Sequence, residues 1–326
     1  MHLTSTSEKI YIAGHKGLVG SAVLAHFAGL GYDNLVVRER TALDLRRQHD
    51  VETFFAKERP DFVILAAAKV GGIMANQTYP GEFIHDNLGI QLNVIQAAHN
   101  HAVKRLIFLG SSCIYPRQAP QPIREEFLLS GPLEPSNQWY SVAKIAGIKL
   151  CQAYSEQYGD DYVCLMPSNV YGPNDNFDRL NSHVLPALLR RFHEAKWGDD
   201  NRPVTVWGSG KPRREFLYSW DLARACHCVL SAPLETIRDV APDAMMNVGM
   251  GHDITIAHLA DLVKDVVGWN GAIEFDRSKP DGTSRKLLEI GRIKKLGWEP
   301  TTNLEEGLAL TYDWFKSQPE WQHRER

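Results

Sequence analysis

The chain opens with a short apolar strand that runs into a glycine-rich turn and then a helix, and no other feature limits its possible folds as strongly. The strand is residues 9–13, the turn is 14–21, and the apolar helix continues to Leu30. Glycines spaced by two residues permit a tight turn and let a pyrophosphate approach the helix N-terminus, whose free N–H groups and dipole favour an anion. The pattern favours a dinucleotide-binding turn over a plain strand-to-helix connection. The residues expected to hold the cofactor here are Gly14, Lys16, Gly17, Leu18, Val19 and Gly20.

Strands and helices then alternate along the first half of the chain. Residues 61–68 and 104–110 are nearly continuous apolar runs, as buried parallel strands are, and 162–166 is a further strand. Helices are expected over 87–98 and from about 138 to 158. This alternation predicts an α/β fold, a doubly wound parallel sheet (Rossmann) with right-handed crossovers. Ligands bind beyond the carboxyl ends of such strands.

The second strand, residues 35–37, is followed by Arg38, Glu39 and Arg40. NAD enzymes place an acidic residue at the end of this strand to bind the ribose hydroxyls. Strand alternation is expected to put Arg38 and Arg40 on one side and Glu39 on the other. Two guanidinium groups, together with Lys16, suit the extra phosphate of NADP, since Arg binds phosphate bidentately. A solvated run of charges is the alternative.

Asp44 and Leu45 come at a spacing that could reach the adenine of the same cofactor.

The organisation into domains follows from these signals. We therefore expect residues 1–172 to form an NADP-binding Rossmann domain, with a return of the chain to it around 215–250. Beyond residue 172, Gly, Pro, Asn and Asp accumulate and the expected helices become short, which is typical of a substrate lobe. Residues 173–326 are expected to form this smaller, mixed α/β lobe.

Composition argues against several classes of function. The formal net charge of -3 over 326 residues provides no basic field for nucleic acid. The longest apolar run, residues 62–68, is too short to span a bilayer, and the first residues lack the apolar segment of a signal peptide. Five cysteines without framework spacing suggest free thiols in a reducing compartment. We expect a cytoplasmic protein with no nucleic-acid or membrane partner.

Tyr140 and Lys144 lie four residues apart on an expected helix, so their side chains share one face. A Lys held near a Tyr favours the phenolate, and we expect Lys144 to pull the pKa of Tyr140 below its usual value of about 10. Upstream, Ser111 and Cys113 stand where a strand ends. A small Cys at a strand end is usually only packed, and a lone His such as His183 is more often a surface or capping residue.

Five stretches make the chain resemble a known family. They are AAAKVGGI at 66–73, LGSSCIYP at 109–116, NSHV at 181–184, VWGSG at 206–210 and KPDGT at 279–283. On these stretches the chain resembles the extended short-chain dehydrogenases/reductases that act on nucleotide sugars, and within them the GDP-L-fucose synthase family. The resemblance covers nearly the whole chain. It implies a bifunctional enzyme that uses NADPH, epimerises GDP-4-keto-6-deoxy-D-mannose at carbons 3 and 5, and then reduces carbon 4 to give GDP-L-fucose.

The resemblance also implies catalytic roles. Tyr140 matches the proton donor of the reduction, Lys144 the residue that lowers its pKa, and Ser111 the hydroxyl that polarises the ketone. Cys113 and His183 match the pair that inverts carbons 3 and 5, for which a base on one face and an acid on the other are required. A thiol and an imidazole can each exist in either protonation state near neutral pH.

Further contacts follow from the same resemblance. The family's glycine turn often has Arg where this chain has Lys16, which keeps the charge but loses the bidentate fork. Cations can meet the diphosphate of GDP, and an indole can lie against a ring. The residues expected to bind the GDP-sugar are Arg191, Trp207, Arg214, Asp281 and Lys286. The remaining cofactor contacts are expected from Arg40, Asp44, Leu45, Leu109, Gly110, Ser111, Ser112, Lys144, Pro167, Ser168, Asn169, Val170 and His183.

Two other functions remain open. In a plain NADPH-dependent 4-keto sugar-nucleotide reductase, Cys113 and His183 would be structural. A catalytically idle NADP-binding regulatory protein would have no chemical need for Ser111, Tyr140 and Lys144 together.

The expected partner is a small-molecule GDP-sugar. A homodimer through the helices around 87–98 and 140–157 is expected by family analogy. No metal site is expected, since the cysteines at 226 and 228 have no partner ligands.

Overall fold

The computed structural model describes residues 2–179, 181–198, 202–279 and 281–321. Its centre is a six-stranded, all-parallel sheet with the strand order β10-β5-β4-β3-β1-β2. β1, β3, β4 and β5 are buried along their whole length, which explains their nearly continuous apolar sequences. The strands are β1 (Ile10–Ala13), β2 (Leu35–Val36), β3 (Phe62–Leu65), β4 (Arg105–Leu109), β5 (Tyr162–Pro167) and β10 (Met245–Val248).

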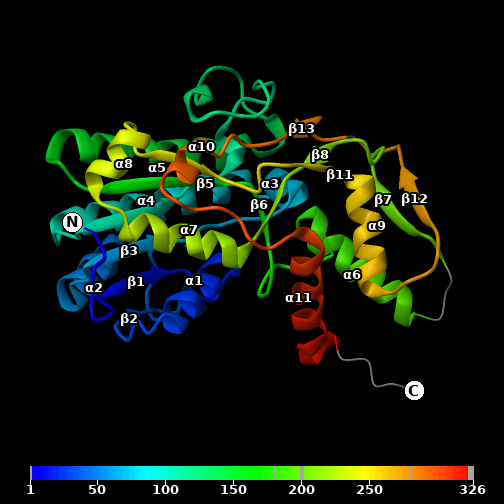
Figure 1. The fold of residues 1–326 in the computed structure, drawn as a ribbon, viewed down its shortest axis with the longest axis horizontal. Coiled ribbons are helices and arrows are strands. Elements are labelled where there is room, and N and C mark those ends of the chain that lie inside the picture. Colours follow the sequence, from blue (N-terminus) through cyan, green and yellow to red (C-terminus); the bar gives the residue numbers. More distant parts are fainter. Residues whose placement is uncertain (1, 180, 199–201, 280, 322–326) are drawn as a thin grey trace.

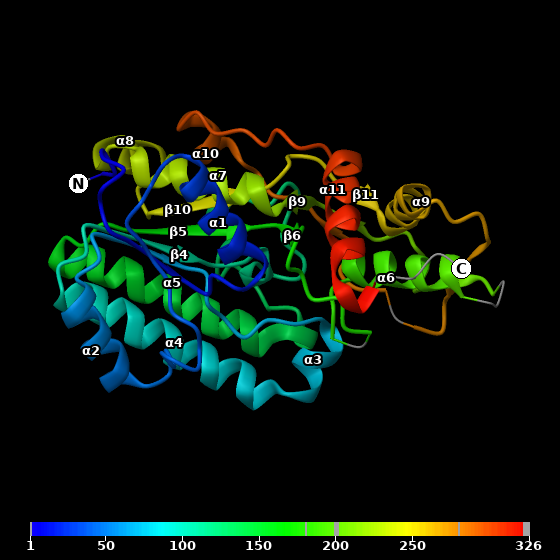
Figure 2. The ribbon, with the colours of Figure 1, turned by 90° about the horizontal axis from the view of Figure 1, so that it is seen from below.

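Helices cover both faces of this sheet (Figure 1). α2 (Gln48–Glu58), α4 (Pro80–Asn100) and α5 (Gln138–Tyr158) lie on one face, and α1 (Leu18–Gly29) and α7 (Ser219–Ser231) lie on the other, as Figure 2 shows. The short helix α10 (Gly291–Lys295) packs against the edge strand β10 and against α8 (Leu234–Val240). The expected doubly wound α/β fold is confirmed. In the described part of the chain, no helix is both long and apolar enough to cross a membrane.

A smaller lobe stands beyond the carboxyl ends of the sheet strands, on the right in Figure 1. Its helices α6 (Val184–Trp197), α9 (Ile256–Val267) and α11 (Leu304–Ser317) contribute to a second hydrophobic cluster, which includes Phe192, Leu259 and Phe315. Short strands complete it. β7 (Val204–Trp207) pairs with β12 (Ile273–Asp276), β8 (Arg213–Arg214) lies between β11 (Ile254–Thr255) and β13 (Arg285–Lys286), and β6 (Asn169–Tyr171) pairs with β9 (Phe216–Tyr218).

The chain passes between the two lobes more than once. α7 and β10 return it to the larger lobe after the first strands of the smaller one. Both elements lie within the return that we expected around 215–250. Leu288, Ile290, Ile293 and Trp298, which we expected in the substrate lobe, also pack in the larger lobe's hydrophobic cluster. A division at residue 173 therefore does not follow the packing, because sequence position does not determine which core an apolar side chain joins.

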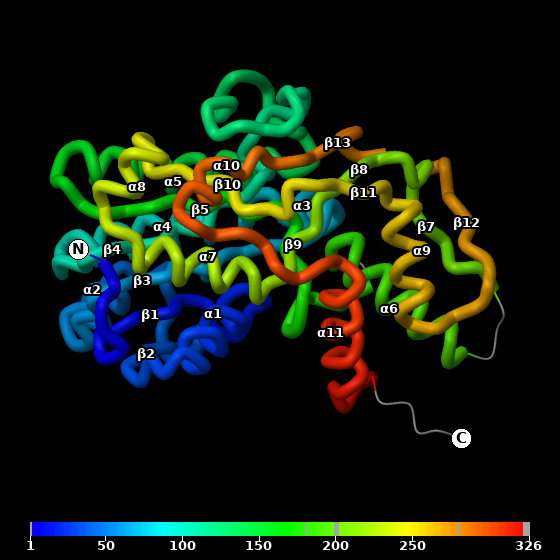
Figure 3. Tube along the Cα trace, in the orientation of Figure 1, coloured from blue at the N-terminus to red at the C-terminus, as the bar shows by residue number. Residues whose placement is uncertain are grey.

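The loop between β4 and α5 stands above the sheet in Figure 3. It is anchored at two places. Tyr115 Oη donates to Asn247 Oδ1 over 2.6 Å at the end of β10, and Ile123 N donates to Leu287 O over 2.7 Å after β13. The remaining short helices are η1 (Ser112–Ile114), η2 (Glu125–Phe127) and η3 (Pro135–Asn137) in this loop, α3 (Ile73–Thr78) and η4 (Pro319–Trp321).

Candidate active site

The glycine-rich turn joins β1 to α1 beside the point where the strand order reverses, between β1 and β3. Gly14 has a φ of +90°, and a Cβ on it would lie 2.8 Å from the backbone N of Ala67, so the turn passes directly against the end of β3. A Cβ on Gly20 would lie 2.2 Å from the Gly14 carbonyl oxygen. The close approach of turn, helix and strand therefore requires glycine at both positions.

The N-terminus of α1 is open to an anion. Its N-cap residue, Gly17, offers no side-chain acceptor, and the first turn of the helix carries no acidic residue. Orphan N–H groups and the positive end of the helix dipole therefore face the turn. A pyrophosphate is held in this way at the first turn of a doubly wound sheet, so the residues present fit a dinucleotide.

The charged residues after β2 are arranged differently from the expectation. β2 is only two residues long, so strand alternation does not extend to them. Arg38 turns towards α2, where its NH2 lies 2.6 Å from Glu58 Oε1. Glu39 instead faces the glycine-rich turn, where its Oε1 lies 2.6 Å from Lys16 Nζ. Of the three cations expected to meet an additional phosphate, Arg38 is turned away, Lys16 is at the turn but paired with Glu39, and Arg40 interacts electrostatically with Asp44.

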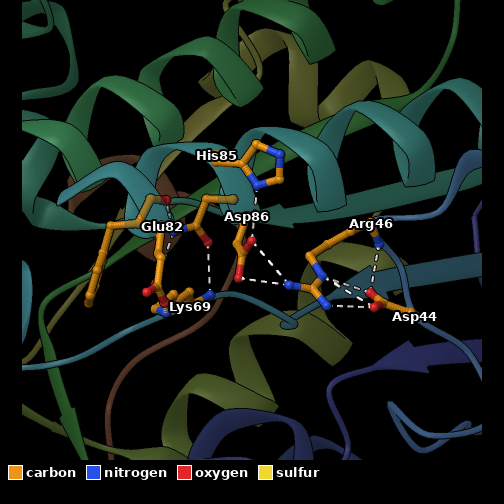
Figure 4. Close-up of polar contacts among 8 residues, drawn as sticks. Asp44, Arg46, Lys69, Glu82, His85 and Asp86 are labelled. Atoms are coloured by element: carbon orange, nitrogen blue, oxygen red, sulfur yellow. Dashed lines mark hydrogen bonds and ion pairs between the residues drawn. The ribbon is translucent and has the colours of Figure 1, made fainter. Parts of the chain in front are cut away.

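Asp44 is linked to α4 through Arg46 (Figure 4), and Leu45 through a hydrogen bond from the same helix. Arg46 lies between two carboxylates, with NH2 2.7 Å from Asp44 Oδ2 and NH1 3.2 Å from Asp86 Oδ2 on α4. Hydrogen bonding from the Arg46 guanidinium holds the pKa of Asp44 at about 2. Asn93 Nδ2 donates to Leu45 O over 2.9 Å. Arg46 was not among the residues expected at the site, because a charged loop residue gives no spacing signal in the sequence.

The same helix fixes the loop after β3. Asn87 accepts from Lys69 N and donates to Lys69 O, both over 2.9 Å. Lys69 Nζ also pairs with Glu82, as Figure 4 shows. α4 therefore attaches both loops that border the glycine-rich turn.

The loop at the end of β4 and the helix α5 bring the expected catalytic hydroxyls and thiol together. Cys113 N donates to Ser111 Oγ over 3.2 Å, and Ser141 Oγ on α5 donates to Cys113 O over 2.8 Å. Tyr140, on the same helix, is hydrogen-bonded to Ser111. Ser111, Cys113 and Tyr140 thus share one small region.

Lys144 lies one turn further along α5 and is buried. Its Nζ donates to Leu109 O over 2.8 Å and lies 5.9 Å from the centroid of the Tyr140 ring. Burial lowers the pKa of Lys144 to about 8, so the ammonium is still mostly charged at pH 7.

The pKa of Tyr140 shifts in the direction opposite to our expectation. Burial raises it above its usual value, the charge on Cys113 adds to the rise, and the hydrogen bond with Ser111 opposes it. The Lys144 ammonium is directed at the Leu109 carbonyl, and its charge does not offset the loss of solvation. The predicted lowering of the Tyr140 pKa was therefore wrong, and the phenol holds its proton at neutral pH.

Two cations from the smaller lobe approach Cys113. Lys286 Nζ lies 3.8 Å from Cys113 Sγ. Arg214 stands opposite Lys286 in the ladder between β8 and β13. It interacts electrostatically with Cys113, Glu134 and Asp281, and burial lowers the pKa of its guanidinium. Both residues were expected to bind substrate; Lys286 also contacts the Cys113 thiol, and Arg214 interacts with it electrostatically.

Glu215 fixes the two strands that carry these cations. Its side chain is buried, with Oε1 accepting from Gly251 N over 2.7 Å and Oε2 from Leu288 N over 3.0 Å. Burial raises its pKa to about 7. Glu215 was not expected at the site. Its position directly before the apolar strand β9 could have indicated a buried, hydrogen-bonded carboxylate.

His183 is the N-cap residue of α6. Its side chain is exposed to solvent, yet the surrounding protein lowers the pKa of the imidazole, so the ring is mostly neutral at pH 7. The two residues before it, Asn181 and Ser182, pack against the loop after β3, where Gly72 N donates to Asn181 O over 2.8 Å. His183 therefore directly follows a segment that packs against the N-terminus of α3. Within the described residues, no hydrogen bond joins its ring to Cys113 or Tyr140.

The other residues expected to bind substrate gather at β7. The Arg191 guanidinium lies 5.5 Å from the centroid of the Trp207 ring, and Lys279 Nζ lies 5.6 Å from a ring centroid of the same indole. Trp207 remains 48% exposed, so it is available to a ring of a ligand. Asp281 instead holds the turn after β7, accepting from Ser209 N over 2.8 Å and from Ser209 Oγ over 2.7 Å.

The remaining expected cofactor residues line the ends of β4 and β5. Gly110 N donates to Leu165 O over 2.8 Å and Ser168 N to Val248 O over 2.9 Å, while Asn169 Nδ2 donates to Glu215 O over 2.8 Å. These bonds fix the main chain where a dinucleotide lies across a doubly wound sheet. The set consists of Leu109, Gly110, Ser112, Pro167, Ser168, Asn169 and Val170.

Cys226 and Cys228 both lie on α7 as free thiols. Across the described ranges, no group of three or more His, Cys, Asp or Glu side chains is placed to hold a metal ion.

Residues 10–249 match the model of the NAD dependent epimerase/dehydratase family. The chain belongs to this family. The chain is 55% identical to one relative, GDP-L-fucose synthase 1 of Arabidopsis thaliana, over 315 residues, which cover 96% of this chain and 94% of that protein. It is 53% identical to the GDP-L-fucose synthase of Escherichia coli (strain K12) over 313 residues, covering 95% and 97%. Among solved structures, a GDP-mannoheptose C4 reductase from Campylobacter jejuni with NADP bound has a TM-score of 0.88 at 37% identity, covering 97% of this chain and 100% of that one.

Proposed function

We propose that this protein is a bifunctional epimerase-reductase that converts GDP-4-keto-6-deoxy-D-mannose to GDP-L-fucose with NADPH. The observation that carries the proposal is the placement of the Cys113 thiol beside Ser111 and Tyr140 at the end of β4. Reduction needs only the hydroxyl pair and Lys144, whereas the inversion of two carbon centres needs a further base. The 53% and 55% identity to proteins named GDP-L-fucose synthase supports this assignment.

The reduction of carbon 4 needs a hydride, which NADPH supplies when bound, and a proton. Tyr140 is protonated at neutral pH, since a phenol has a pKa near 10 and burial raises it further, so the residue carries the proton that the ketone oxygen takes up. The Ser111 hydroxyl polarises the same oxygen. The ammonium of Lys144 favours the phenolate that remains after the transfer.

The epimerisation uses the acidity that the ketone gives to carbons 3 and 5. Cys113 acts as the base, with Lys286 Nζ 3.8 Å from its Sγ and the guanidinium of Arg214 interacting with it electrostatically. His183 returns a proton to the opposite face. Its imidazole must take up a proton before each delivery, because loss of solvation lowers the pKa of the ring below its usual value.

The cofactor that we propose is NADP(H). Gly14, Gly17 and Gly20 form the turn for its pyrophosphate, while Lys16 and Arg40 are the cations for its 2′-phosphate. The Campylobacter jejuni reductase with NADP bound supports the choice. For the GDP-sugar, the exposed Trp207 ring and the cations Arg191 and Arg214 are the proposed contacts, and Asp281 shapes the turn beside them.

A plain 4-keto reductase is the second candidate, because a structurally similar protein is named a C4 reductase. The test supplies GDP-4-keto-6-deoxy-D-mannose with NADPH and identifies the sugar by NMR. GDP-L-fucose is the expected product. A GDP-6-deoxyhexose that keeps the original configuration at carbons 3 and 5 would favour the plain reductase, and no NADPH oxidation would favour an idle protein.

We propose a homodimer that forms through α4 and α5. The two helices pack side by side, and Leu92 and Val142 expose 54% and 40% of their surface on them. Light scattering should give twice the mass of one chain, and a monomer would contradict this. All five cysteines are free thiols, which agrees with a cytoplasmic location.

A further inference from the structure

The ion pair between Lys16 and Glu39 lies where an NADP site and an NAD site differ. We propose that Glu39 is a specificity-determining residue: it weakens binding of the NADP 2′-phosphate and gives the 2′-hydroxyl of NAD an acceptor. This inference rests on the proposed cofactor site. Its consequence is that the chain uses both cofactors, with a preference for NADPH that Glu39 limits.

The geometry brings the carboxylate to the glycine-rich turn. Glu39 Oε1 lies 2.6 Å from Lys16 Nζ, and Lys16 stands between Gly14 and Gly17. Arg38, the preceding residue, is drawn away to Glu58 at 2.6 Å. The side chain that faces the turn from the end of β2 is therefore an acid, although two arginines flank it.

The chemistry of this position is known for doubly wound sheets. An acidic residue at the end of the second strand accepts a hydrogen bond from the ribose 2′-hydroxyl of NAD, while a cation there accommodates the 2′-phosphate of NADP. Glu39 and Lys16 supply one group of each kind. A bound 2′-phosphate can pair with Lys16 and Arg40, but it then lies close to the Glu39 carboxylate.

The pair can be opened by a ligand, because both side chains are largely in solvent, 67% exposed for Lys16 and 55% for Glu39. Exposed ion pairs contribute little, so a phosphate can displace Glu39 from Lys16. The carboxylate nevertheless remains attached to the same short loop. A dianion about 5 to 6 Å from one unit charge in water loses about tenfold in affinity through repulsion.

The test measures binding of NADP+, NAD+, 2′,5′-ADP and 5′-AMP to the full chain by calorimetry, without sugar substrate. Glu39→Gln removes the carboxylate charge and keeps the side-chain size. We expect NADP+ and 2′,5′-ADP to bind about tenfold more tightly, and NAD+ and 5′-AMP several-fold more weakly. The gain should shrink at high salt, where exposed charges are screened.

Glu126→Gln is the matched control, because Glu126 is also an exposed acid in an ion pair, 3.2 Å from Arg124, and lies on the loop between β4 and α5. It should leave all four affinities unchanged. The inference is overturned if Glu39→Gln binds NADP+ as the wild type does, while NADP+ binding itself is intact. If the wild type binds neither dinucleotide, the proposed cofactor site fails as well.

Discussion

Replacing Cys113 with Ala tests the bifunctional assignment most directly, because the structure separates the side chain's chemistry from its packing. The hydrogen bonds that Cys113 makes with Ser111 and Ser141 use its main-chain N and O, so Ala retains both. The side-chain contact that is lost is the one between Sγ and Lys286 Nζ at 3.8 Å. The loop at the end of β4 should therefore keep its shape.

The substitution should slow proton abstraction strongly while changing the stability of the fold only slightly. Cys113 is only partly buried, so the free energy of unfolding should change within about 1 kcal/mol. Removal of a positioned base should slow proton abstraction by roughly 10² to 10⁴-fold. The variant should fold and bind NADPH while the exchange of the hydrogens at carbons 3 and 5 collapses.

The assay follows the uptake of deuterium from deuterated water into the sugar by NMR, alongside NADPH oxidation. Tyr140→Phe is the control, since it should keep the exchange and lose reduction. His183→Asn should impair reprotonation and yield sugar that is reduced before both centres invert. Wild-type exchange and GDP-L-fucose formation in both Cys113→Ala and His183→Asn would refute the reasoning, and the epimerase would then have to be a separate enzyme.

Three further perturbations test the cofactor site and the buried acid. Arg40→Ala should raise the Michaelis constant for NADPH far more than that for NADH, because the contact proposed for Arg40 is with the 2′-phosphate, which NADH lacks; equal changes would remove it from that role. Gly20→Ala should abolish NADP+ binding in calorimetry, since its Cβ would lie 2.2 Å from Gly14 O, whereas Gly29→Ala, with nothing within 4 Å, should bind normally. Glu215→Gln should change the pH dependence of unfolding by urea. The folded pKa of Glu215 is raised to about 7 from 4.5, so its stabilising contribution is lost as pH rises through this range. The wild type should lose stability relative to the variant over that interval, and parallel curves would contradict the burial argument.

Local patterns explain why much of the fold was predictable. The helix that carries Tyr140 and Lys144 runs from Gln138 to Tyr158, close to the expected ends, because helix periodicity is a property of neighbouring residues. The glycine spacing likewise predicted a turn that only glycine permits, as Gly14 and Gly20 show. Turn chemistry and periodicity are both local.

The electrostatic state of the site was not predictable in the same way. Our expectation for the pKa of Tyr140 used the charge of Lys144 and omitted the loss of solvation, which is the larger effect. The sequence also did not show that Glu39, and not Arg38, faces the glycine-rich turn, because the side of the chain that faces the turn depends on the packing beyond β2. Burial and strand length are set by the packing of the whole sheet.

The sequence by itself determined the alternation of strands and helices in the first half of the chain, the glycine-rich turn and the identity of the chemical groups. The tertiary structure alone decided which of those groups meet. Lys286 lies 173 positions from Cys113 along the chain, and only the pairing of β8 with β13 and the anchoring of the β4–α5 loop bring its Nζ to 3.8 Å from the thiol. Contacts over such separations depend on which surfaces pack together, and the side-chain pattern of one segment does not show which other segment it will pack against.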